Sequence, residues 1–184
     1  MTYRRLMLSL PCLFFALGVV AGRAAAQTCT APIPAGTCTA STSTTMTVGT
    51  VLRLSLSASS TILTPPATAG YDAGFVADNG PATTVTANRS WTLRITAGSA
   101  FWTASNTTPG VIARVTKPAA DLQWSTSPGG SFTGVTVAGA TFTSGGGTAP
   151  AGTTTTIAYR TLYSWVLDTP GAYSLVVVLT LTAP

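Results

Sequence analysis

Side chains that could carry acid–base chemistry are few in this chain of 184 residues. It has no histidine and no glutamate, and its acidic residues are the four aspartates Asp72, Asp78, Asp121 and Asp168. General acid–base catalysis uses groups that titrate near neutral pH, most often histidine or paired carboxylates. Each aspartate stands beside turn or loop residues, where a short carboxylate accepts hydrogen bonds from nearby backbone amides. The sequence therefore predicts turn positions for the aspartates rather than a catalytic pair.

Nucleophilic chemistry has equally little support. A catalytic serine needs a base beside it, and without histidine only Lys117 is available, with no motif around it. Segment 168–171 (DTPG) resembles the triplet of aspartic proteases, but Pro170 interrupts it and no second copy supplies the paired carboxylate. The glycines at 145–147 do not stand between a strand and a helix, so we expect a loop there rather than a phosphate cradle. We predict that the protein is not an enzyme and binds no cofactor.

The first 26 residues have the pattern of a secretory signal peptide. Arg4 and Arg5 precede an apolar stretch, and three alanines precede Gln27, as expected at a cleavage site. A retained membrane anchor is the alternative, but Pro11 interrupts the apolar stretch, which is short for a membrane span. We therefore predict residues 1–26 to be a signal peptide and the chain to be exported to the periplasm, the cell surface or the medium. The mature chain would have no transmembrane segment.

The mature chain would be a single domain, residues 27–184, that carries little charge. Its six basic residues against four aspartates leave a net charge of +2, without a cluster dense enough to neutralise many phosphates. We therefore expect no nucleic-acid partner. Charged residues are only 7% of the chain, against roughly a quarter in average proteins. Thr, Ser, Gly and Ala replace them, as in many envelope and extracellular β proteins.

Two cysteines would remain after export, Cys29 and Cys38, because Cys12 belongs to the signal peptide. An even pair in an oxidising compartment predicts a disulfide, and closing so short a loop would stabilise the fold by about 2–3 kcal/mol. A metal site is the alternative, but the chain has no histidine and no second cysteine pair. We expect no bound metal.

Two-residue alternation dominates the rest of the chain and predicts strands. Leu52, Leu54 and Leu56 share one face of a strand over 50–57. The C-terminal run predicts a hairpin, in which strands 153–167 and 172–182 are joined by a turn at 168–171. Residues 67–81 predict a loop with at most a short strand at 75–76.

In total we predict about eight to ten strands and no helix after the signal peptide. Turn signals recur at roughly 8–12-residue intervals, which favours an all-β, Ig-like antiparallel β-sandwich. Residues 27–45 would be irregular and would contain the disulfide loop.

The four tryptophans are the side chains that could form a binding surface. Trp91, Trp124 and Trp165 fall on apolar strand faces, so we expect them in the core. Trp102 stands near a loop. Together with Tyr71 it is the candidate for a ligand-facing aromatic.

Three features give the mature chain a resemblance to bacterial secreted pilin-like sandwiches, especially the spore coat protein U group. They are a cysteine near the mature N-terminus, the strand WTLRI at 91–95 followed by Ala97 and Gly98, and the segment PGAY at 170–173 before a long terminal strand. The resemblance implies an Ig-related secreted sandwich, in a family of which some members build surface fibres through a chaperone–usher route. An incomplete sandwich would accept a strand from a neighbour, and the segment Thr44 to Ser57 is the natural donor.

These observations leave three functions open. The first is a non-enzymatic structural or adhesive subunit of the cell envelope or surface, whose partners are proteins, including copies of itself. The second is an accessory subunit packed on a larger envelope or membrane complex. The third is a carbohydrate-binding module.

Overall fold

The computed structural model describes residue 30 and residues 37–184. The chain divides into two units, residues 1–47 and 48–184. Described residues of the first unit contain no helix or strand, and the whole fold lies in the second. The predicted signal peptide lies outside the described residues and stays a prediction. In the part of the chain that the structure describes, no helix is long and apolar enough to cross a membrane.

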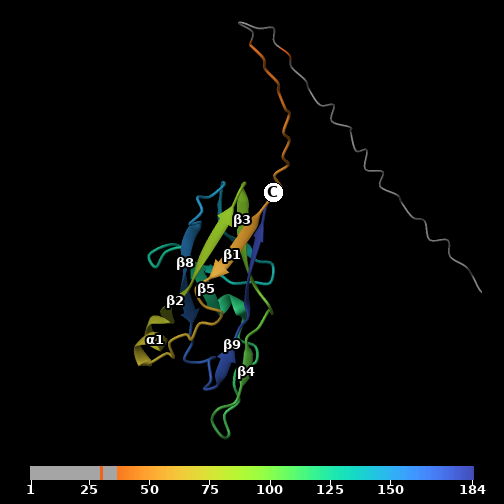
Figure 1. Ribbon diagram of the computed structural model, residues 1–184. Coiled ribbons are helices and arrows are strands. Elements are labelled where there is room, and N and C mark those ends of the chain that lie inside the picture. Colours follow the sequence, from red (N-terminus) through yellow and green to blue (C-terminus); the bar gives the residue numbers. More distant parts are fainter. Residues whose placement is uncertain (1–29, 31–36) are drawn as a thin grey trace, which may run out of the picture. The chain divides into compact units, whose positions relative to one another are not determined.

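The second unit is almost entirely β, and every strand pair is antiparallel, which confirms the predicted fold class (Figure 1). Its strands are β1 (Leu52–Leu56), β2 (Phe75–Ala87), β3 (Trp91–Ala97), β4 (Thr103–Ser105), β5 (Leu122–Ser125), β6 (Thr133–Gly134), β7 (Ala140–Gly145), β8 (Thr153–Leu162), β9 (Ala172–Ser174) and β10 (Val177–Thr182). The sequence did not predict the short helix α1 (Thr68–Ala73) or the 3-10 helix η1 (Ala119–Asp121).

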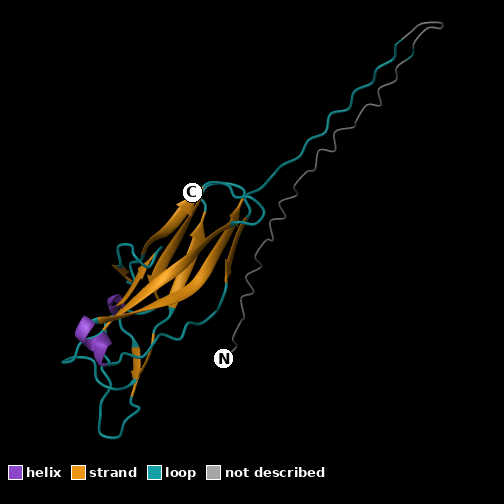
Figure 2. Ribbon diagram, turned by 90° about the vertical axis from the view of Figure 1, so that its left-hand side faces the viewer, coloured by secondary structure: helices purple, strands orange, loops and turns teal. Residues whose placement is uncertain are grey.

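The strands form two facing sheets and a small third one. The first sheet has the order β1-β2-β8-β5-β6, the second β10-β3-β7, and β4 pairs with β9. Figure 1 labels β4 and β9 at the lower end of the unit, and Figure 2 shows the helices at that end as well. Alternate residues of both sheets meet in one core, where Leu93 and Ile95 of β3 lie with Val85 of β2 and Ile157 of β8. This is the burial pattern that two-residue alternation predicts for a sandwich.

The predicted C-terminal hairpin is wrong, because its two strands lie in opposite sheets. Strand β8 pairs with β2 and β5, whereas β10 pairs with β3 and aligns Leu179 with Ile95. The connection 163–176 crosses from one sheet to the other. Each strand has an apolar face, and packing these faces across the core buries both of them.

The predicted loop at 67–81 is also wrong. Helix α1 ends at Gly74, whose φ of 77° suits glycine, and β2 then begins at Phe75. Strand β2 runs through the turn-like residues 79–81 and accommodates them by a register shift between Asn79 and Ala82. At Gly80 an added Cβ would lie 2.4 Å from Cε2 of Tyr159, so the bulge lets a core ring pack against bare backbone.

Candidate functional site

An open groove of about 950 Å³ runs beside strand β10. We call it the β10 groove. Apolar side chains from both sheets line it, among them Leu56 of β1, Ile157 and Tyr159 of β8, and Val177 and Leu179 of β10. Strand β10 is the outermost strand of its sheet, so one of its edges has no neighbouring strand. The edge strand β1 of the other sheet lies near β10.

The core is only partly covered along this groove. On β3, which lies between two strands, the inward residues Leu93 and Ile95 are fully buried. On β10 the residues that point to the same core, such as Val177 and Leu179, are only partly buried, and so is Leu54 of β1. The unpaired backbone N–H and C=O groups along the free edge of a strand are a template for one more strand. The geometry fits a sandwich that is open between β1 and β10.

The chain before β1 carries a further alternating apolar pattern. Met46 and Val48 are exposed. Asn88 holds the entry to β1, because its side-chain oxygen accepts the Val51 N–H at 2.9 Å and its amide donates to the Gly49 carbonyl at 2.7 Å.

The predicted donor segment 44–57 is therefore corrected. Its part Leu52–Leu56 is strand β1, paired with β2 of the same chain. Residues 44–51 and Ser57 lie outside the strand.

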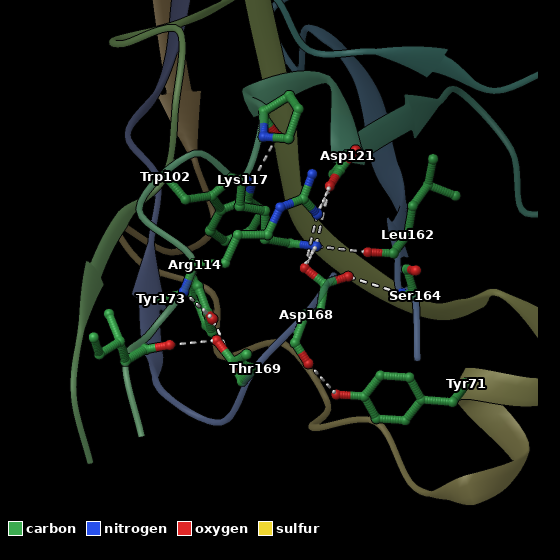
Figure 3. A network of polar contacts seen from close by, with 12 residues as sticks. Tyr71, Trp102, Arg114, Lys117, Asp121, Leu162, Ser164, Asp168, Thr169 and Tyr173 are labelled. Atoms are coloured by element: carbon green, nitrogen blue, oxygen red, sulfur yellow. Dashed lines mark hydrogen bonds and ion pairs between the residues drawn. The ribbon is translucent and has the colours of Figure 1, made fainter. Parts of the chain in front are cut away.

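A buried ion-pair cluster borders the β10 groove, which Lys117 and Asp168 help to line. Figure 3 shows the cluster. Lys117 is the centre of the cluster, with a side chain only 2% exposed. Its ammonium donates to Oδ1 of Asp168 at 2.9 Å, to Oδ2 of Asp121 at 3.1 Å and to the Leu162 carbonyl at 2.8 Å. These contacts use all three of its hydrogen-bond donors.

Arg114 completes the cluster as a second cation. Its Nη1 donates to Asp168 at 3.0 Å and to Asp121 at 3.4 Å, so two cations face two carboxylates. The other oxygen of Asp168 accepts the Ser164 N–H at 2.8 Å. The predicted turn position of Asp168 is thus only part of its role, since it also neutralises a buried lysine.

The electrostatics of the cluster favour structure over catalysis. Burial alone would raise the pKa of Asp168, but hydrogen bonds from Lys117, Arg114 and the Ser164 amide hold that pKa below its ordinary value. The carboxylate is therefore ionised at neutral pH and is no proton donor. No serine hydroxyl is among the hydrogen-bond partners of the Lys117 ammonium, so the cluster contains no serine–lysine pair.

Both predicted ligand-facing aromatics, Trp102 and Tyr71, line the β10 groove. Trp102 is only 6% exposed, and its indole N–H donates to the Pro118 carbonyl at 3.0 Å. Its ring packs in the core and also lines the β10 groove, so a contact between Trp102 and a ligand stays a prediction. Tyr71 is half-buried on α1 and stacks on Trp165, with ring centroids 4.5 Å apart.

The position of Trp165 contradicts the prediction made for it. The sequence predicted it in the core, yet it is 60% exposed. Strand β8 ends at Leu162, so the alternation that placed Trp165 on a buried face stops three residues too early. Trp91 and Trp124 are buried as predicted.

The remaining predicted sites involve metal ligands and cysteines. Cys29 lies outside the described residues, so its disulfide with Cys38 stays a prediction. Among residue 30 and residues 37–184, no three histidine, cysteine or acidic side chains gather where they could hold a metal ion. Comparison of the chain with models of known protein families and with curated proteins finds no match.

Proposed function

We propose that this protein is a non-enzymatic, exported structural subunit of the bacterial cell envelope or surface, which assembles with copies of itself. The observation that carries the proposal is the β10 groove, an apolar groove beside an unpaired strand edge. A strand from a neighbour would pair with that edge and cover the half-buried core residues. The low charge, the scarcity of titratable groups and the resemblance to pilin-like sandwiches support the same proposal.

The strand that fits the groove is residues 44–51 of another copy. Met46 and Val48 alternate with Thr45 and Thr47, so a strand would turn the apolar pair to one face and the threonines to the other. The apolar pair would pack against Val177 and Leu179, two of the partly buried residues of β10. Register follows from this pattern, because a shift by one residue would put threonine in the groove.

Deletion of residues 27–50 tests the proposal. The mature chain, 27–184, should form polymers in size-exclusion chromatography with light scattering and in electron micrographs. The deletion variant should be a monomer, because it keeps β1 and the core but lacks the donor. Circular dichroism and a thermal melt of both proteins check that the sandwich is still folded.

A matched pair of double variants separates donor pairing from other causes. Met46→Asp with Val48→Asp should abolish polymers, because it places two charges in an apolar groove. Thr45→Asp with Thr47→Asp should leave polymers intact, because it changes only the outward face. Monodisperse, monomeric 27–184 would refute the proposal.

A second candidate, an accessory subunit on a larger envelope complex, is favoured by the exposed Val176 and Val178 beside and on β10. This alternative predicts a monomer that co-purifies with one other protein from native envelopes. Substitution of both valines by serine should release that partner.

A further inference from the structure

We propose that Trp165, Tyr71 and Asp72 form a binding platform for neutral oligosaccharides beside the β10 groove, which Tyr71 also lines. The two rings stack at 4.5 Å with 25° between their planes, and Trp165 is the exposed member. The indole N–H donates to Oδ1 of Asp72 at 3.1 Å, so a carboxylate stands at the edge of the exposed ring. We call these three residues the Trp165 platform.

The platform is held in place by the buried cluster beneath it. Trp165 lies in a turn closed by the Asp168 N–H, which donates to the Ser164 carbonyl at 3.0 Å, and by the Ser164 N–H on the Asp168 side chain. Tyr71 reaches the same residue, because its hydroxyl donates to the Asp168 carbonyl at 3.4 Å (Figure 3). Asp168 is itself paired with the buried Lys117. A large aromatic ring is therefore exposed to water and fixed at the same time.

The chemistry of the platform selects the ligand class. In β-1,4-linked glucose and N-acetylglucosamine all ring substituents are equatorial, so both faces of each pyranose expose C–H groups and are flat. Such a face packs on the face of an indole, and binding sites commonly combine aromatic rings with a few polar groups that fix orientation. The Asp72 carboxylate can accept a sugar hydroxyl, and its charge disfavours anionic sugars.

Fluorescence gives a direct assay, because Trp165 is the one exposed indole among the four tryptophans of the chain. Trp91, Trp102 and Trp124 are all more than nine-tenths buried, so acrylamide should quench Trp165 almost alone. Cellohexaose or chitohexaose should protect the wild-type mature chain from quenching in a saturable titration. Hexagalacturonic acid, an anionic sugar, should protect it less.

Substitutions test which residues bind the oligosaccharide. Trp165→Ala should weaken oligosaccharide binding in calorimetry by about tenfold or more, and Asp72→Asn by less, because its amide oxygen still accepts a hydroxyl. The control is Val166→Ser with Leu167→Ser, which removes two exposed apolar neighbours and should leave sugar binding unchanged.

Two outcomes would overturn the proposal. One is no protection by either sugar at about 10 mM, a concentration that detects even weak sites. The other is that sugars do not bind and the chain instead captures an envelope protein, in a way that requires both Trp165 and Leu167. This surface would then be a protein contact. Trp165 does not line the β10 groove, so Trp165→Ala should leave polymers intact, and the two proposals fail independently.

Discussion

At the scale of single residues, the ion pair between Lys117 and Asp168 is the contact with the largest desolvation cost. Both side chains are withdrawn from water, 2% and 5% exposed, and the ion pair joins the segment before η1 to the segment after β8. Taking charges out of water costs free energy that the pair and its hydrogen bonds must offset. Loss of one partner leaves the other charge buried and unpaired, so the pair is a sensitive point of the fold.

Replacement of Lys117 by Met should lower the free energy of unfolding by about 3–5 kcal/mol, the usual loss when one partner of a buried pair is removed. Urea unfolding of the variant lacking residues 27–50 would measure it without polymers. Arg53→Met is the control, because Arg53 is exposed and its side chain reaches only the Thr86 hydroxyl. The control should change stability by no more than about 0.5 kcal/mol. Equal effects of both substitutions would show that the buried cluster adds nothing.

The depressed pKa of Asp168 makes stability depend on pH in one direction. An aspartate in an unfolded chain has a pKa of about 3.9, and the pKa of Asp168 in the folded protein is lower. The contribution of the ionised carboxylate is therefore complete above about pH 5 and is lost as pH falls through the folded pKa. Asp168→Asn should unfold more easily at pH 7 and show a flatter dependence between about pH 5 and 2. Parallel curves for both proteins across this range would contradict the assignment.

At the scale of elements, strand β2 is where sequence signals and structure diverge most. Asn79, Gly80 and Pro81 are turn formers, yet the strand continues through them by a bulge. The bulge follows from a contact that is distant in sequence, since the ring of Tyr159 on β8 occupies the space that a side chain at position 80 would need. Local turn chemistry predicted the irregularity but not that both sides of it belong to one strand.

Gly80→Ala should destabilise the fold by about 1–3 kcal/mol, as overpacking of a core does, because the new Cβ would overlap the Tyr159 ring. Gly146→Ala is the matched control, since nothing lies within 4 Å of its added Cβ and its φ is not positive. Thermal unfolding of the two variants measures the difference. A loss at Gly146 as large as that at Gly80 would count against the close approach.

At the scale of the second unit, the two sheets leave the core open along one side. Strands β1 and β10 are each the last strand of their sheet, and the half-buried residues of the core gather between them. This arrangement explains what would stabilise the proposed assembly, because one added strand would complete both the backbone pairing and the burial of apolar residues.

Hydrogen exchange on the variant lacking residues 27–50 tests this arrangement. Alternate amides on the free edge of β10 should exchange rapidly, because no neighbouring strand accepts their hydrogen bonds. Addition of a peptide with the sequence of residues 37–51 should slow exactly those amides and raise the melting temperature. Full protection of β10 in the variant alone would mean that the edge is already covered.

The sequence by itself determined the features that depend only on residues close together in the chain. Two-residue alternation predicted an antiparallel all-β fold and placed Trp91, Leu93 and Ile95 in its core, because side-chain direction along a strand depends only on neighbours in the chain. The scarcity of titratable groups is likewise visible without coordinates.

Only the tertiary structure decided which strands face each other, that Lys117 meets Asp168, that Trp165 is exposed and that the core opens beside β10. These features depend on pairing between residues far apart in the sequence, as with Lys117 and Asp168, which lie 51 positions apart. An apolar face shows that a strand must be covered, but it does not specify by what. For this reason alternation could predict strands at 153–167 and 172–182 and still pair them wrongly as one hairpin.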